Sequence, residues 1–186
     1  MSTNTTSVWR KKLKELEIVV VIPTYNNGKT LAAVIEEVCR YADDIIVVND
    51  GSTDDTANIL EQYPAIRTIT HPVNKGKGTA LKHGLSQAQK EGFRYAITID
   101  SDGQHFASDI PCFIEAIEKE PDTLLVGARN LASDNMPGKN TFANKFSNFW
   151  FRLETGLKLE DTQSGYRLYP LRKMNVQSCW YTAKYE

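Results

Sequence analysis

Ile18-Val19-Val20-Val21-Ile22 is an unbroken apolar run, and the stretch Pro23-Thr24-Tyr25-Asn26-Asn27-Gly28 ends it. A continuous apolar run of this length is typical of a β-strand that is covered on both faces. The next apolar residues follow at helical spacing and are Leu31, Val34, Ile35 and Val38. The sequence therefore predicts a buried strand, a polar loop and a helix, in that order.

The same alternation continues along the chain. Further strands are predicted at 45–48, 66–70, 94–99 and 123–126, and helices around Ile59 and Leu60, on the face of Ala80, Leu81, Leu85 and Ala88, and at 108–120. Ser52 and Thr53 are candidate N-caps of the helix that contains Ile59. Strands that alternate with single helices imply right-handed crossovers. We therefore expect an α/β protein with a mostly parallel, Rossmann-like sheet and helices on both faces.

Composition limits the class of protein. The chain has 186 residues, is 41% hydrophobic and carries a formal net charge of −1, which fits one soluble domain and argues against nucleic-acid binding through bulk charge. Three widely spaced cysteines, Cys39, Cys112 and Cys179, form neither a metal motif nor a disulfide framework. No signal peptide and no apolar run of about 18 residues is evident. These features favour a cytoplasmic protein.

The two ends of the chain differ from its centre. Residues 1–16 are expected to form a polar N-terminal extension, in which Arg10 to Lys14 is a solvated helix start or, less favoured, a contact with an anionic membrane surface. A single domain is expected over 17–186. Residues 179–186 contain neither a helix stop nor a closing strand, which predicts that this domain is truncated at its C-terminus.

Polar loops follow the predicted strands and, in a parallel sheet, meet at its carboxyl edge, where ligands bind. Asp100-Ser101-Asp102-Gly103-Gln104-His105 follows one such strand directly. Its carboxylate and amide oxygens suit a hard divalent cation, Mg²⁺ or Mn²⁺. Taken alone, an Asp-x-Asp loop is a weak signal, because most acidic loops are simply solvated.

Six short motifs occur in order between residues 18 and 170. They are Pro23-Thr24-Tyr25-Asn26, Val47-Val48-Asn49-Asp50-Gly51-Ser52-Thr53-Asp54, Asn74-Lys75-Gly76-Lys77-Gly78, Asp100-Ser101-Asp102-Gly103-Gln104-His105, Gly127-Ala128-Arg129 and Ser164-Gly165-Tyr166-Arg167. Together they resemble family 2 glycosyltransferases of the GT-A fold, particularly the polyprenyl-phosphate (dolichol-phosphate) mannose synthase-like branch. The resemblance implies a metal-dependent, inverting transfer of a sugar from GDP-mannose or a UDP-sugar. The implied acceptor is a polyprenyl phosphate, used in cell-envelope glycan synthesis by an enzyme at the cytoplasmic face of a membrane.

The resemblance also implies roles for individual residues. The residues implied to bind the donor nucleotide are Pro23, Tyr25, Asn27, Asp50, Lys77 and Asp100. The ring of Tyr25 would stack on the base, and Lys77 lies in a helix-start loop that would meet phosphate. The implied metal ligands are Asp102 and Gln104, with Asp100 either sharing the cation or bridging to ribose. The implied catalytic residues are Asp102, Arg129, Asp161 and Arg167. Arginine suits bidentate recognition of an acceptor phosphate, whereas Asp161 is the candidate base for a hydroxyl acceptor.

Several positions depart from the family pattern. Asn27 stands where an acidic residue is frequent, Asn49 replaces a common aspartate beside Asp50, and Phe106-Ala107 stands where prolines are frequent. The first departure weakens any claim about base or ribose contacts of Asn27. None of them removes a predicted metal ligand.

Other functions remain open at this point. The chain could be a sugar-nucleotide-binding module without turnover, or a glycosyltransferase that acts on a hydroxyl of a glycan or cell-surface precursor. A haloacid dehalogenase-type phosphatase is less favoured, because its Asp-x-Asp pair follows the first strand.

Two further groups of side chains are open to more than one interpretation. The aromatic face of residues 142–153 is interpreted as core or as a surface for a lipid-like substrate, with Lys145 a candidate phosphate contact. His71, His83 and His105 are expected to be loop or surface residues rather than catalysts, with only His105 near the site.

Overall fold

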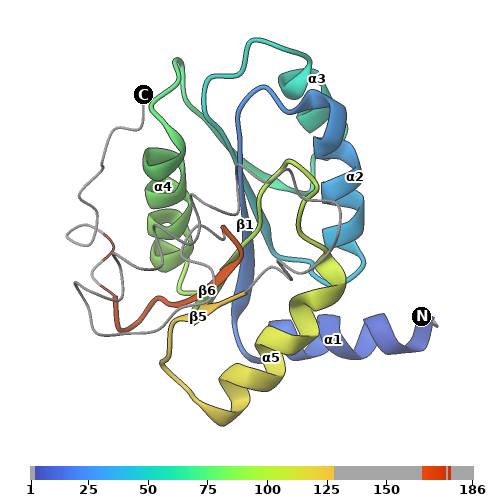
Figure 1. The fold of residues 1–186 in the computed structure, drawn as a ribbon, viewed down its shortest axis with the longest axis vertical. Helices are drawn as coiled ribbons and strands as arrows, with labels where there is room; N and C mark the ends of the chain where they lie inside the picture. Colours follow the sequence, from blue (N-terminus) through green and yellow to red (C-terminus); the bar gives the residue numbers. More distant parts are fainter. Residues whose placement is uncertain (1–2, 128–164, 175, 177–186) are drawn as a thin grey trace, which may run out of the picture.

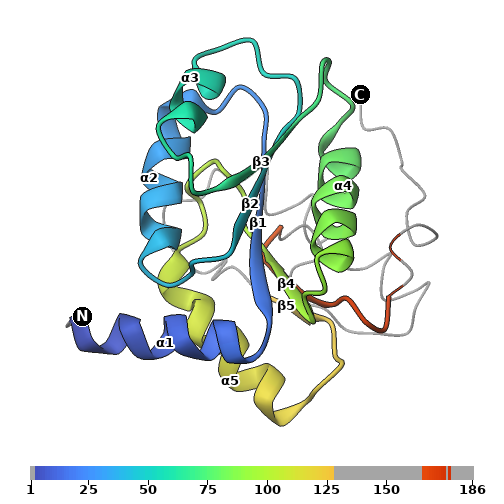
Figure 2. The same cartoon turned by 180° about the vertical axis from the view of Figure 1, so that it is seen from behind.

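The computed structural model describes residues 3–127, 165–174 and 176. A central sheet carries helices on both of its faces (Figures 1 and 2). In chain order the elements are α1 (Thr3–Glu15), β1 (Ile18–Thr24), α2 (Gly28–Cys39), β2 (Ile45–Asn49), α3 (Thr56–Glu61), β3 (Arg67–Thr70), α4 (Lys77–Lys90), β4 (Tyr95–Thr98), the 3₁₀ turn η1 (Ala107–Asp109), α5 (Ile110–Lys119), β5 (Leu125–Val126) and β6 (Arg167–Pro170). The predicted alternation of strands and helices is confirmed.

The sheet has six strands in the order β3-β2-β1-β4-β6-β5. β1 pairs in parallel with β2 and β4, and β2 pairs in parallel with β3. β6 runs antiparallel to both β4 and β5. The mostly parallel α/β sheet is therefore as expected, with one reversed strand that the apolar pattern does not predict.

Two apolar layers cover the sheet. Ile18, Val20 and Ile22 of β1 pack with residues of α2 and α5, and Val19 and Val21 pack with residues of α4. Figures 1 and 2 show α4 on one side of the sheet and α2 and α3 on the other. Every residue of β1 is buried, which explains why its sequence has no polar alternation.

Helix α1 lies beside α5 at the end of the sheet where β1 begins (Figure 1). It belongs to the segment expected to be a polar extension, yet Leu13 is only 2% exposed and joins the main core. Lys12 pairs with Glu118 of α5 at 2.8 Å, and Arg10 pairs with Asp43 at 3.3 Å. Apolar packing and ion pairs therefore both attach α1 to the domain. No helix within the described ranges is long and apolar enough to cross a bilayer.

The loop after β2 holds the loop after β1. Helix α3 begins at Thr56, and the expectation that Ser52 or Thr53 caps it is wrong. Both residues instead bind Asn26: the Ser52 hydroxyl accepts its backbone N–H at 3.0 Å, and the Thr53 N–H donates to its Oδ1 at 2.8 Å. Asp54 accepts hydrogen bonds from the backbone N–H and the hydroxyl of Thr56.

Candidate functional site

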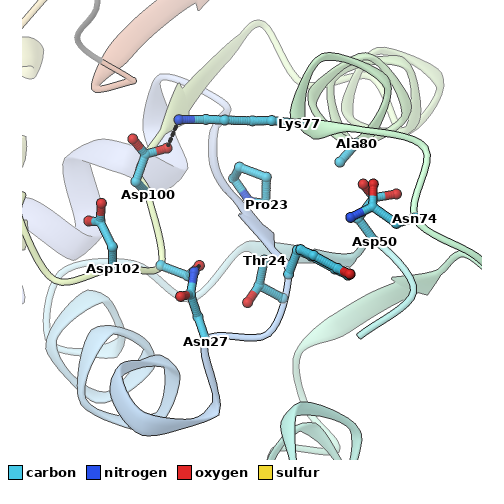
Figure 3. A pocket seen from close by; sticks show the side chains of 11 residues that line it. Pro23, Thr24, Asn27, Asp50, Asn74, Lys77, Ala80, Asp100 and Asp102 are labelled. Carbon is cyan, nitrogen blue, oxygen red and sulfur yellow. Dashed lines mark hydrogen bonds and ion pairs between the residues drawn. The ribbon is translucent and has the colours of Figure 1, made fainter. Parts of the chain in front are cut away.

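A pocket lies at the carboxyl edge of the sheet, between the ends of β1, β2 and β4 and the start of α4 (Figure 3). Seven of the residues that line it have roles predicted from the sequence: Pro23, Tyr25, Asn27, Asp50, Lys77, Asp100 and Asp102. Four others line it without a predicted role: Thr24, Asn74, Ala80 and Ser101. All six residues predicted to bind the donor nucleotide thus lie at this pocket. Tyr25 is 43% exposed, so its ring is accessible to a ligand.

The start of α2 fixes the loop that follows β4. The side-chain amide of Asn27 donates to the Ser101 hydroxyl at 2.7 Å. The hydroxyl of Thr30 donates to the backbone carbonyl of the same serine at 2.6 Å. Ser101 is 2% exposed and lies between Asp100 and Asp102. These two hydrogen bonds therefore restrict the positions of the Asp100 and Asp102 carboxylates on either side of Ser101.

Asp50 follows β2 and is only 2% exposed. Its Oδ1 accepts the backbone N–H of Lys75 at 2.9 Å and lies 2.6 Å from Nδ1 of His71. Its Oδ2 has no hydrogen-bond partner among the described residues. Figure 3 shows the side chain at the pocket wall beside Asn74. One oxygen of this carboxylate is therefore fully engaged by the protein, and the other is buried without a partner among the described residues.

Thr24, the last residue of β1, carries a second such atom. It is 3% exposed, and its Oγ1 also has no partner in the described part of the chain. Its carbonyl accepts the backbone N–H of Asp50 at 2.9 Å, so the two open groups come from neighbouring strands. Leaving a buried polar group unpaired costs about 1–3 kcal/mol. A ligand that offers a donor and an acceptor to this wall would recover that cost.

Asp100 carries a negative charge at the other end of the pocket. Its carboxylate lies 2.8 Å from Lys77 Nζ and 3.7 Å from Nε2 of His105. Burial alone raises the pKa of Asp100, but the neighbouring His105 and the positive charge of Lys77 outweigh it and lower this pKa to about 2. Asp100 is thus ionised throughout the neutral range, and Lys77 reaches it from the first turn of α4 (Figure 3).

Asp102 and Gln104 form the exposed part of the same loop. Oδ1 of Asp102 accepts the backbone N–H of Gln104 at 2.9 Å, and Gln104 does not line the pocket. Within the described ranges, no three His, Cys, Asp or Glu side chains gather in a way that could hold a metal. The carboxylates of Asp100 and Asp102 do fit a hard cation that takes its other oxygen ligands from amides, water or a bound molecule.

Strand β6 brings residues 165–170 against the end of β4. Gly165 packs directly on Asp100: a Cβ added to this glycine would lie 2.3 Å from Oδ2 of the carboxylate. The Gly165 carbonyl accepts the hydroxyl of Thr98 at 2.7 Å. Arg167 is half-buried and pairs with Thr98 in the β4–β6 ladder, but it does not line the pocket. Of the predicted acceptor residues, Arg167 is therefore placed next to β4, which ends two residues before Asp100.

The remaining predicted residues cannot be compared with the structure. Arg129 and Asp161 lie outside the described residues, as do Lys145 and the aromatic segment 142–153. Their roles stay predictions.

The structure corrects the expectation for the histidines. His71 and His105 lie in loops, as expected, but they are 4% and 7% exposed, so neither is a surface residue. His71 contacts Asp50 just as His105 contacts Asp100, so His105 is not the only histidine near the site. His83 in turn lies 2.7 Å from His71, between Nδ1 and Nε2. The sequence did contain one signal for His71: it directly follows a strand and so falls at the carboxyl edge.

Comparison with known proteins identifies the family. The model described as "Glycosyl transferase family 2" matches residues 19–176. The chain is 31% identical over 181 residues to the UDP-N-acetylglucosamine–dolichyl-phosphate N-acetylglucosaminyltransferase of Methanococcus voltae, covering 87% of this chain and 72% of that protein. It is 28% identical over 160 residues to the polyprenol monophosphomannose synthase of Mycolicibacterium smegmatis, covering 81% and 60%. It spans less than two thirds of the length of several curated relatives.

The fold is similar to that of glucosyl-3-phosphoglycerate synthase from Mycobacterium tuberculosis, solved with Mn²⁺, UDP-glucose and phosphoglyceric acid. The TM-score is 0.66 at 22% identity, over 92% of this chain and 62% of that one. This likeness concerns the fold, and it agrees with the expected GT-A architecture. The family match over residues 19–176 and the identity to the Methanococcus enzyme show that the chain belongs to glycosyl transferase family 2.

Proposed function

We propose that this chain is an inverting glycosyltransferase that moves a sugar from a nucleotide-diphosphate-sugar to a polyprenyl (dolichol-type) phosphate. One observation carries the proposal: seven residues with roles implied by the family motifs line a single pocket. The names of the Methanococcus and Mycolicibacterium relatives, which specify dolichyl phosphate and polyprenol, support this acceptor class.

The nucleoside is proposed to occupy the side of the pocket formed by β1 and β2. The accessible ring of Tyr25 offers a surface on which a base can stack. The open Oδ2 of Asp50 can accept an N–H of the base or a ribose hydroxyl, and the open hydroxyl of Thr24 can bond a neighbouring group. Asn27 lies between this wall and Asp102 (Figure 3), a position that suits the ribose.

The diphosphate is proposed to occupy the side formed by α4 and β4. The ammonium of Lys77 lies in the pocket, in the first turn of a 14-residue helix. The first N–H groups of a helix and its positive dipole end favour phosphate oxygens. Charge and backbone donors thus converge where a diphosphate would lie.

A divalent cation, Mg²⁺ or Mn²⁺, is proposed to bind Asp100, Asp102 and Gln104. When bound, it supplies positive charge to the diphosphate leaving group. The chain prepares this place by keeping Asp100 ionised and by fixing the intervening Ser101 through two hydrogen bonds. The solved complex of the Mycobacterium synthase with Mn²⁺ and UDP-glucose is consistent with a cation in this role.

The acceptor is proposed to be anionic already. A lipid phosphate needs little help from a general base, so catalysis consists mainly of positioning and of stabilising the leaving group. Arg129 and Arg167 are proposed to hold that phosphate, since a guanidinium binds it bidentately. Asp161 would serve as the base only for a hydroxyl acceptor. Such an enzyme would work peripherally at the cytoplasmic face of a membrane.

The test is a transfer assay with labelled GDP-mannose, UDP-glucose and UDP-N-acetylglucosamine, a short polyprenyl phosphate in detergent, and either MnCl₂ or EDTA. Asp102→Ala should lower the transfer rate about 100-fold or more, because a charged group at the reacting centre is lost. Asp43→Ala is the matched control, since this exposed carboxylate precedes β2 at the opposite edge of the sheet.

Two results would refute parts of the proposal. Tight nucleotide-sugar binding with no transfer to any acceptor would identify a binding module rather than an enzyme. Transfer to a glycan hydroxyl but not to the lipid phosphate would overturn the acceptor assignment while leaving the donor site intact.

A further inference from the structure

Asp50, His71 and His83 form a row of directly bonded side chains behind the pocket wall. Oδ1 of Asp50 lies 2.6 Å from Nδ1 of His71, and Nε2 of His71 lies 2.7 Å from Nδ1 of His83. The two imidazole rings meet edge to face, at 88°. Asp50 lines the pocket, whereas neither histidine does. The row therefore connects the pocket wall to the middle of α4 without itself touching a ligand.

The hydrogens in this row have few arrangements. An ionised carboxylate only accepts, so Nδ1 of His71 must carry the hydrogen that faces Asp50. The second contact holds one hydrogen, given either by a neutral His83 to His71 or by a doubly protonated His71 to His83. Burial lowers the pKa of His83, and the neighbouring His71, Lys75 and Lys82 lower it further. In both arrangements His71 still donates to Asp50.

His83 holds the opposite nitrogen of the His71 ring. The carboxylate of Asp50 sets the Nδ1–H tautomer of His71, and the contact with His83 limits how far the imidazole ring can turn away from that carboxylate.

Oδ1 of Asp50 also accepts the backbone N–H of Lys75, so two donors hold this oxygen and only Oδ2 is left for a partner. We propose that His71 and His83 are positioning residues, which fix Asp50 so that its unpaired oxygen accepts an N–H from the donor base. The inference rests on the proposed function and specifies the base chemically. Uracil and guanine carry a ring N–H at a suitable edge, whereas a base alkylated at that nitrogen does not.

The test is calorimetry of nucleotide binding to the whole chain in MgCl₂. The probes are UDP, GDP, their analogues methylated at uracil N3 or guanine N1, and inorganic diphosphate. Wild type should bind UDP or GDP about 10-fold or more tightly than the methylated analogue, since a buried acceptor is otherwise left unpaired. His71→Ala should weaken binding of the parent nucleotide about 10-fold and change binding of diphosphate or the methylated analogue less than about 2-fold.

His71→Asn tests positioning against a loss of packing. Its side-chain amide can donate from about the place of Nδ1, so it should restore nucleotide binding to within about 3-fold of wild type. His83→Ala should cause a smaller loss than His71→Ala, because it frees the His71 ring to turn but does not remove the hydrogen bond to Asp50. Thermal unfolding of each variant shows whether the fold is retained.

Three results would overturn the inference while leaving the proposed function intact. They are equal loss of diphosphate and nucleotide binding in His71→Ala, methylated analogues that bind like their parents, and no rescue in a folded His71→Asn variant. If wild type binds neither UDP nor GDP, the proposed function fails and the inference falls with it.

Discussion

Replacing Gly165 by alanine should displace the carboxylate of Asp100. The new Cβ would lie 2.3 Å from Oδ2 and 2.6 Å from Oδ1. Raising the shorter contact to 3.0 Å, below which Cβ contacts essentially do not occur, moves the carboxylate by about 0.7 Å. Such a shift moves the carboxylate away from its place in the 2.8 Å ion pair with Lys77. Since a misplacement of about 1 Å costs on the order of 10²-fold in rate, we expect a transfer rate about 10- to 100-fold lower.

The assay is the initial rate of sugar transfer, combined with calorimetry of nucleotide binding and thermal unfolding. Overpacking should also lower the free energy of unfolding by about 1–3 kcal/mol, so a control must lose stability without touching the site. Gly92→Ala is that control: its φ of +88° strains an alanine, and nothing lies within 4 Å of the new Cβ. A Gly165→Ala variant with the wild-type rate would refute the idea that this glycine positions Asp100.

Three further changes test the same pocket. In EDTA, wild type should lose about 2 kcal/mol of unfolding free energy relative to Asp100→Asn as the pH falls from 4 to 2. The reason is that folding lowers the pKa of Asp100 from 3.8 to about 2 and so favours the charged form. Urea unfolding of both proteins across this pH range measures the difference, and parallel curves of stability against pH would contradict it. Thr24→Val should weaken nucleotide binding about 5-fold without lowering the melting temperature of the free protein, since the hydroxyl has no partner in the described residues. Binding is measured by calorimetry, and an unchanged affinity would exclude a contact between this hydroxyl and the ligand. Gly51→Ala should destabilise the fold by about 3 kcal/mol, because its φ is +72° and its Cβ would lie 2.4 Å from the backbone of Val73; a thermal shift below about 2 °C would disprove the close packing.

The parallel strands could be predicted because burial on both faces excludes polar residues, as in β1, where all seven residues are buried. Strand β6 could not be predicted in the same way. Arg167-Leu168-Tyr169-Pro170 has no apolar run, and its strand conformation depends on antiparallel pairing with β4. That pairing joins segments about 70 residues apart, so local sequence carries little signal for it.

The candidate site likewise has a part that the sequence predicts and a part that it does not. Topology alone predicts that Asp50, Lys77 and Asp100 share one edge, and they line one pocket. The burial of His71 was not predictable, because β3 is an edge strand with mostly exposed residues. His71 is buried against Asp50 and against His83 of α4, tertiary contacts that no local pattern reveals.

The carboxylates of Asp50 and Asp100 differ in what surrounds them, and this difference supports the proposed orientation of the donor. Asp50 is held by a backbone N–H and by His71, partners that stay in place and leave one oxygen for an uncharged N–H. Asp100 is paired with Lys77, whose side chain is 54% exposed and can turn to another anion when one arrives. A carboxylate with fixed partners suits the specific recognition of an uncharged group, and a lysine with an exchangeable partner suits a charged group that must be bound and released. This difference supports the proposed placement of the nucleoside at Asp50 and of the diphosphate at Lys77, because a donor placed the other way round would leave the unpaired oxygen of Asp50 facing another anion.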